Sequence, residues 1–303
     1  MNIAKSILLS LVLGAAALGD RAALSAAPST GSGPAPGEPP GRVKSSSKLE
    51  ITGDLQTGTV TVSWVGRGVL KQGRELGGHF KAVGKSAGGS NVYVIDPTED
   101  QALFRVEAAS SPVFSVNIVG YVKLSLPPGL SLIANPLYYT NNALSFWLPQ
   151  APDGAQVFKY LAGGGFEVST FDAAAGAWSN PDLQVPIGEG FYFHNPSSQA
   201  FGYTFFGEVH QGTLVNPLAA GISTKGSLVP QSGSINSLHG IPGQPGDEIR
   251  IYTPDGQNGG VYSSSVFDAT ANAWVPDLTL GVGQGFWIQK QNPQDWVRIF
   301  FAN

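Results

Sequence analysis

Two parts of this sequence, about 95 residues apart, contain the same motifs in the same order. The first part has FDA at 171–173, AW at 177–178, PDL at 181–183 and GxGF at 188–191. The second part has FDA at 267–269, AW at 273–274, PDL at 276–278 and GxGF at 283–286. A period this long lies well above the roughly 20–50 residues of solenoid repeats. The pattern therefore predicts a tandem duplication of one module, at residues 113–206 and 207–303.

Weaker matches extend the repeat toward the N-terminus. Asp153–Tyr160 matches Pro245–Tyr252 at an offset of 92 residues, and Ala134–Leu137 matches Val215–Leu218 at an offset of 81. A changing offset places insertions between the matched blocks, where loops tolerate them. Two domains side by side are the favoured arrangement, and one sandwich built from two half-domains is the alternative.

Composition favours an all-β fold. The chain has 40 glycines and 22 prolines, which punctuate short strands with turns, and only 13% of its residues are charged. Its net charge is −4, and no basic run supplies the patch that binding to nucleic acid requires. The protein also contains no cysteine, so neither a disulfide nor a lipid-modified cysteine contributes.

The N-terminal region predicts export. Residues 1–26 have a basic start, an apolar run from Ile7 to Leu18 and small residues near Gly19–Ala27, which is typical of a secretory signal peptide. Residues 27–48 are rich in Pro, Gly and Ser and predict a linker. No second apolar run approaches the length of a membrane span. We therefore expect an extracellular, cell-surface or periplasmic protein without an integral membrane segment after cleavage.

Residues 49–112 carry several short β patterns separated by predicted turns at 66–68 and 84–90. Val62-Ser63-Trp64 and the closing Leu103–Val106 resemble the minimal immunoglobulin-like or fibronectin-like modules of secreted bacterial proteins. The expected fold is thus all-β, a small β-sandwich followed by two tandem homologous β modules.

The remaining chain, from about residue 113 to 303, resembles a family of secreted β-repeat proteins of verrucomicrobial-type bacteria. The resemblance rests on VNIVGYV at 116–122, PPG at 127–129, NP at 135–136, GEV at 207–209, QGTL at 211–214 and VPQSG at 229–233. It implies export and a β fold, and it implies no activity.

The repeated motifs predict structural roles. The GxG pairs allow positive φ or close backbone approach before a strand that points Phe191 inward and Tyr192 outward, with Phe286 inward and Trp287 outward in the second copy. In the FDA…AW motif, the aspartates suit Asx-turns, and Trp178 and Trp274 suit core anchors. A sugar-stacking role for these indoles and calcium binding by the aspartates are the alternatives.

No catalytic, metal or cofactor site is predicted. Gly84–Gly88 spells GxSxG but lacks the strand–turn–helix context of a nucleophile elbow, and the four histidines are far apart in sequence. Carboxylates from distant strands remain compatible with a hydrolase. A binding role needs exposed aromatic rings, and the candidates for ligand contact are Tyr138, Tyr139, Trp147, Tyr192 and Trp287.

The function predicted from the sequence is a secreted or cell-surface, non-enzymatic β protein with a structural, adhesive or binding role. The first alternative is a carbohydrate-binding module protein, and the second is a secreted hydrolase. Extracellular polysaccharide and envelope components are the partners considered, and no cofactor is expected.

The signal-peptide hypothesis gives the first testable prediction. Mass spectrometry of the natively produced protein should find a mature N-terminus between Gly19 and Ala27, because signal peptidase cleaves after small residues. A mature chain that still carries Met1 to Leu24 would contradict it.

Overall fold

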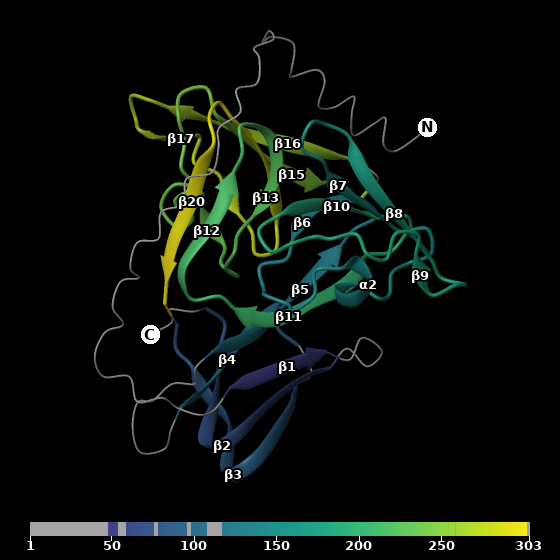
Figure 1. The fold of residues 1–303 in the computed structure, drawn as a ribbon, viewed down its shortest axis with the longest axis vertical. Helices are drawn as coiled ribbons and strands as arrows, with labels where there is room; N and C mark the ends of the chain where they lie inside the picture. The colour runs from purple at the N-terminus through teal and green to yellow at the C-terminus, as the bar shows by residue number, and fades with distance from the viewer. Residues whose placement is uncertain are drawn as a thin grey trace, which may run out of the picture. The chain divides into compact units, whose positions relative to one another are not determined.

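The computed structural model describes residues 48–53, 59–75, 78–95, 98–107, 117–257 and 259–301. The predicted signal peptide lies outside these residues, as does the linker apart from Lys48. The described chain is almost entirely antiparallel β structure, with one short helix, α2 (Leu144–Trp147) (Figure 1). The all-β prediction is confirmed.

A six-stranded sheet begins the fold. Its strands run in the order β1-β2-β4-β5-β11, and β3 pairs with the other side of β2. Their bounds are β1 (Leu49–Gly53), β2 (Val60–Gly73), β3 (Lys81–Ile95), β4 (Gln101–Glu107), β5 (Ile118–Leu126) and β11 (Phe201–Val209). The N-terminal strands therefore share one sheet with strands of the following segment, and β11 crosses the predicted boundary at residue 206.

The turns predicted at 66–68 and 84–90 are wrong. Both segments lie within the long hairpin β2–β3, whose register shifts between Val65 and Arg67. Gly66, Gly88 and Gly89 have positive φ, so these glycines accommodate local irregularities and do not end the strands. Gly84–Gly88 is thus part of a strand, which is not the setting of a nucleophile elbow.

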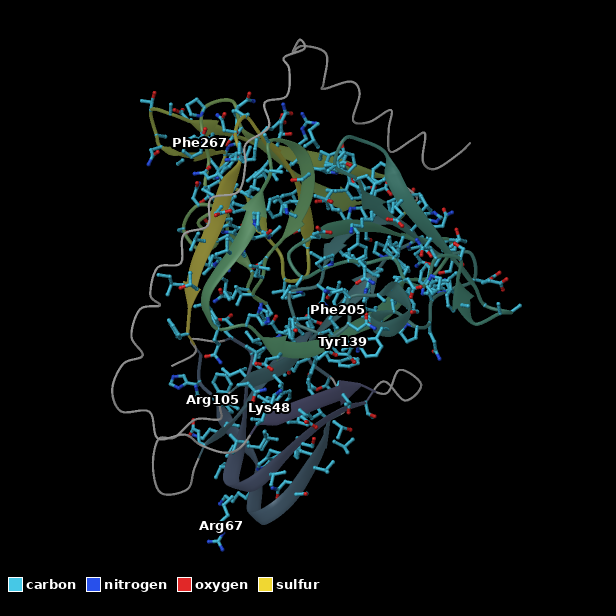
Figure 2. All side chains as sticks on the ribbon, viewed as in Figure 1. Lys48, Arg67, Arg105, Tyr139, Phe205 and Phe267 are labelled. Atoms are coloured by element: carbon cyan, nitrogen blue, oxygen red, sulfur yellow. The ribbon has the colours of Figure 1, made fainter. Side chains whose placement is uncertain are left out.

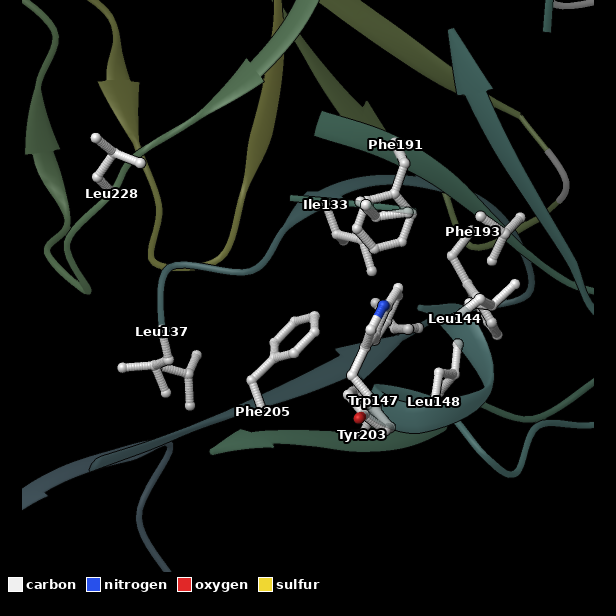
Figure 3. Packing of buried hydrophobic residues seen from close by; sticks show 14 of the residues in the cluster. Ile133, Leu137, Leu144, Trp147, Leu148, Phe191, Phe193, Tyr203, Phe205 and Leu228 are labelled. Carbon is white, nitrogen blue, oxygen red and sulfur yellow. The ribbon is translucent and has the colours of Figure 1, made fainter. Parts of the chain in front are cut away.

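The first five-stranded sheet has the order β6-β10-β7-β8-β9. Its strands are β6 (Gly129–Ala134), β7 (Gln156–Tyr160), β8 (Phe166–Asp172), β9 (Ala177–Trp178) and β10 (Gly190–Asn195). Side chains of this sheet, of α2 and of the β5–β11 pair form the largest hydrophobic core. Figure 3 shows Trp147 of α2 in the middle of that core, close to Phe191 and Phe205.

The second five-stranded sheet has the order β13-β19-β15-β16-β17. Its strands are β13 (Gly221–Gly226), β15 (Glu248–Pro254), β16 (Gly260–Asp268), β17 (Ala273–Val275) and β19 (Gly285–Lys290). A separate two-stranded ribbon, β12 (Gly212–Leu218) with β20 (Gln294–Phe300), shares a core with it, and β14 (Gly233–Ser234) pairs with β18 (Thr279–Leu280).

The two five-stranded sheets correspond strand by strand and in register. Tyr192 pairs with Phe158 in the first sheet, and Trp287 pairs with Arg250 at the matching place in the second. The upstream match at an offset of 81 residues, however, is wrong. Ala134 ends β6 whereas Val215 lies in β12, and the register counterpart of Ala134 is Gly226.

The FDA…AW motif has the same structure in both places. Phe171 pairs with Trp178, and Phe267 pairs with Trp274. Both tryptophans are buried, and their indole nitrogens donate to buried backbone carbonyls, at 2.6 Å to Leu148 and at 2.7 Å to Ile241. The core-anchor interpretation of these tryptophans agrees with this geometry.

The preceding aspartates form the turns that the sequence predicted. Asp172 Oδ1 accepts hydrogen bonds from the backbone amides of Ala174 and Ala175. Asp268 Oδ1 does the same for Thr270 and Ala271. These carboxylates therefore cap turns.

These anchors give a stability prediction. Trp178→Ala and Trp274→Ala should each lower the free energy of unfolding by about 3–5 kcal/mol, because each removes a buried indole and leaves a carbonyl without its donor. Phe146→Ala, at an exposed ring of α2, should change it by less than about 0.5 kcal/mol. Urea unfolding followed by circular dichroism measures all three, and equal midpoints would refute the anchoring role.

Candidate functional site

The five aromatic candidates do not form one exposed platform. Trp147 is buried in the first core, and its indole nitrogen donates to the Asn142 carbonyl at 3.2 Å. Tyr139 packs against Phe146 and Phe206, and Tyr138 is partly exposed with its ring 4.5 Å from that of His210. Among the candidates, only Tyr138 therefore has a substantially exposed ring.

Tyr192 and Trp287 lie between the two five-stranded sheets. The sequence correctly places them on the opposite face from Phe191 and Phe286, but the prediction that this face is outward is wrong, because both residues are buried. Trp287 Nε1 donates to the Tyr192 hydroxyl at 2.7 Å, and that hydroxyl also contacts the Tyr262 hydroxyl. Burial raises the pKa of Tyr192 well above its ordinary value, so its hydroxyl remains protonated.

The aromatic contacts between the sheets occur in matching pairs. Tyr160 contacts Trp287 with ring centroids 4.8 Å apart, and its counterpart Tyr252 contacts Tyr192 at 5.9 Å. Such reciprocal contacts have the form of an isologous interface within one chain. The rings of Tyr192 and Trp287 therefore pack the two sheets together, and their faces are not available to a ligand.

The GxG motifs allow the backbones of the two sheets to approach. Ala134 N–H donates to the Gly283 carbonyl at 2.9 Å, and its counterpart Gly226 N–H donates to the Gly188 carbonyl at 3.0 Å. Gly188 and Gly283 both have positive φ. A Cβ atom added at Gly285 would lie only 2.9 Å from the Ile133 carbonyl oxygen. The motif therefore serves inter-sheet contact, as its two glycines suggested.

The acidic side chains are largely engaged in structural contacts. Several cap turns or accept backbone amides, and others pair with cations, as Glu248 does with Arg250 and Glu107 with Lys71 and Arg105. Lys290 and Asp247 form a fully buried ion pair whose remaining partners include Gln294 Oε1 and the Gln291 amide. Among the described residues, no group of three or more His, Asp or Glu side chains is placed to hold a metal.

A polar cleft of about 810 Å³ lies beside β5. Charged and amide side chains line it together with a few apolar ones: Arg74, Glu75, Asp100, Gln101, Val122, Lys123, Leu124, Ser125, Gln231, Ser232, Leu238 and Val282. None of the described residues that line the cleft is aromatic, so these residues would hold a sugar by hydrogen bonds and not by stacking. None of the five predicted aromatic residues lies there.

The most unusual surface is the outer face of the β12–β20 ribbon. Val215 lies opposite Val297, and Ile299 follows two residues later on the same face. All three are exposed, Ile299 at 75%. We call Val215, Val297 and Ile299 the ribbon face. This outer face was not among the sites predicted from the sequence.

The corresponding ribbon, β5–β11, is covered. Tyr121 and Phe206 pair there at the positions that Thr213 and Ile299 occupy in the β12–β20 ribbon. Tyr121 is only 1% exposed because it lies in a core with Trp64 and other side chains of β1–β4, and Phe206 packs against this core. The next pair of β5–β11 includes exposed, polar Lys123, whereas its counterpart in the ribbon face is Val215.

The outer edges of the two ribbons also differ, because the edge of β5 is paired and the edge of β12 is not paired with any described strand. β4 pairs with the outer edge of β5 from Val119 to Val122, and the Lys123 amide donates to the Asp100 carbonyl. Among the described strands, β12 pairs only with β20. One ribbon is thus completed by N-terminal strands, and its counterpart has an apolar face in contact with solvent.

Comparisons with known proteins add no relative. No family model, curated protein or solved structure matches this chain. Within the described residues, no helix has the length and hydrophobicity needed to cross a membrane.

The histidines give a prediction about acid sensitivity. His239 is buried beside Trp296, and burial together with the charge of Arg298 lowers its pKa from 6.5 to about 4. Between pH 6.5 and about pH 4, this histidine is therefore protonated in the unfolded chain and neutral in the folded chain. The stability that neutral His239 contributes is complete above pH 6.5 and is lost as the pH falls toward 4.

Urea unfolding of His239→Gln at pH 7 and pH 4.5 measures this contribution. The variant should lose less stability between the two pH values than the wild type does, whatever its stability at pH 7. Phe146→Ala, which removes an exposed ring and no titratable group, should keep the wild-type dependence. If His239→Gln has the same dependence as the wild type, the assignment is wrong.

Proposed function

We propose that this chain is an exported, non-enzymatic β protein that acts in adhesion or envelope structure by binding a partner. The observation that carries the proposal is the ribbon face. Exposed, adjacent apolar residues on a β ribbon are typical of surfaces that bind other proteins. Where the matching ribbon meets solvent, it carries a lysine.

We also propose that the two halves from β5 to β11 and from β12 to β20 arose by duplication. The same strand order, the same register and the reciprocal contacts between the sheets support this. Under this proposal the two ribbons began as equivalent surfaces. The N-terminal strands then cover one ribbon in the same chain, and the other retains an uncovered surface for a partner.

The use of the acidic residues supports a non-enzymatic role. A hydrolase needs carboxylates or a histidine directed into a pocket. Asp172 and Asp268 cap turns, and Asp247 pairs with Lys290. The two carboxylates that line the cleft beside β5, those of Glu75 and Asp100, lie there together with the cations Arg74 and Lys123. Carbohydrate binding is the second candidate, and the polar cleft beside β5 is the observation that favours it.

Fractionation of cells that make the protein tests the proposed function. Wild-type protein should be recovered with the envelope or outside the cell, and Val297→Lys with Ile299→Lys should weaken its retention at least several-fold, because two charges replace the apolar surface. Val261→Lys, at an exposed valine of β16, is the control and should behave as wild type.

The same experiment separates the alternatives. Recovery of the wild type in the cytoplasm would refute export, and full retention of the double variant would refute the role of the ribbon face. If Lys123→Ala in the cleft abolishes retention on purified extracellular polysaccharide and the ribbon variant does not, carbohydrate binding becomes the better function.

A further inference from the structure

We propose that copies of this chain assemble head to tail, with the β2–β3 hairpin of one copy packed on the ribbon face of the next. The proposal rests on the proposed function, since it names the partner of the ribbon face. The partner is a second copy of the chain, and the surface it offers lies on a different sheet.

The hairpin has an exposed apolar face of its own. Val92 and Val94 lie on one side of β3, opposite Ser63 and Thr61, and Val65 continues that side on β2. All three valines are exposed, Val92 at 66%. We call Val65, Val92 and Val94 the hairpin face. The hairpin face and the ribbon face are thus two uncovered β surfaces made of adjacent aliphatic side chains, and the exposed pair Val266 and Val275 on β16–β17 is a third.

The two segments that contain these faces have formal charges of opposite sign. Residues 60–95, which contain the hairpin, have five basic residues and one acidic residue, a formal charge of +4. Residues 212–301, which contain the ribbon, have four basic and six acidic residues, a formal charge of −2. Figure 2 shows Arg67 projecting from the β2–β3 pair, and exposed Asp295 continues the ribbon face along β20.

Charge decides between the two ways in which copies could pair. An isologous contact would place the hairpin face against a second hairpin face, or ribbon against ribbon, so that like charges would face each other. A contact between hairpin and ribbon joins apolar side chains and sets opposite charges around them. The heterologous contact is therefore favoured.

A heterologous contact leaves one hairpin and one ribbon free at the two ends of any assembly. Further copies therefore add unless the rotation between neighbours closes a ring. Assembly then grows with protein concentration, and salt weakens it because the charges beside the two faces, Arg67 and Asp295, are exposed. Such growth suits a protein with a structural or adhesive role.

The test mixes two variants of the full exported chain that cannot assemble alone. The hairpin variant carries Val92→Lys and Val94→Lys, and the ribbon variant carries Val297→Lys and Ile299→Lys. All four substitutions replace exposed residues, so thermal melting should confirm that both variants remain folded. Sedimentation velocity then measures the size of each sample over a concentration series.

The wild type and the Val261→Lys control should increase in size with concentration, and each variant alone should remain a monomer. An equimolar mixture should form a 1:1 heterodimer and nothing larger, because one intact hairpin face and one intact ribbon face remain between the two chains. A wild type that stays monomeric, or a mixture that stays monomeric while the wild type assembles, would overturn the proposal.

Self-assembly and envelope binding can be refuted separately. A hairpin variant that still dimerises by itself would show ribbon-to-ribbon pairing and refute the head-to-tail contact. If the wild type is monomeric and the ribbon variant still loses envelope retention, self-assembly is wrong and the proposed binding function stands. If retention is unchanged and the mixture forms the heterodimer, self-assembly stands and the envelope-binding role is wrong.

Discussion

The close contact between the two five-stranded sheets is the constraint on which the arrangement of the C-terminal halves depends. Backbone amides of Ala134 and Gly226 reach carbonyls of the opposite sheet, which is feasible only where glycine leaves room. Around these hydrogen bonds, the rings of Tyr192 and Trp287 fill the space between the sheets. Both sheets contribute equivalent positions, so the same backbone contact forms twice. The GxG motif therefore stabilises the packing of the two sheets at two places.

The sequence predicted those parts of the fold that depend on local chemistry. An aspartate after a strand predicts an Asx-turn, and a tryptophan at a fixed distance after it predicts an anchor, as Trp178 and Trp274 illustrate. Strand alternation also assigned Tyr192 and Phe191 to opposite faces. Alternation cannot tell whether the second face meets water or another sheet, because that depends on contacts between distant residues. The outward assignment of Tyr192 and Trp287 was wrong for this reason.

Glycine caused the error in the predicted turns, because its conformational freedom serves irregular strands as well as turns. Gly66 and Gly88 suggested turns, yet they lie within long strands at an irregular register. The ribbon face was missed for a different reason. Val297 and Ile299 alternate with buried neighbours as in any strand with one face in the core, and only the comparison with covered Tyr121 shows that their outer side has no cover.

The difference between the two ribbons links the fold to the proposed function. If the halves arose by duplication, each ribbon would have begun with the same outer face, and any chain that covers just one of them retains an unpaired apolar surface. A protein without a partner would be expected to place polar residues there, since exposed aliphatic β surfaces promote aggregation. The β5–β11 ribbon follows this rule at Lys123, and the β12–β20 ribbon departs from it at Val215 and Val297. This departure lies on a surface whose counterpart is covered by β structure, which is the strongest reason to assign that surface to another β unit.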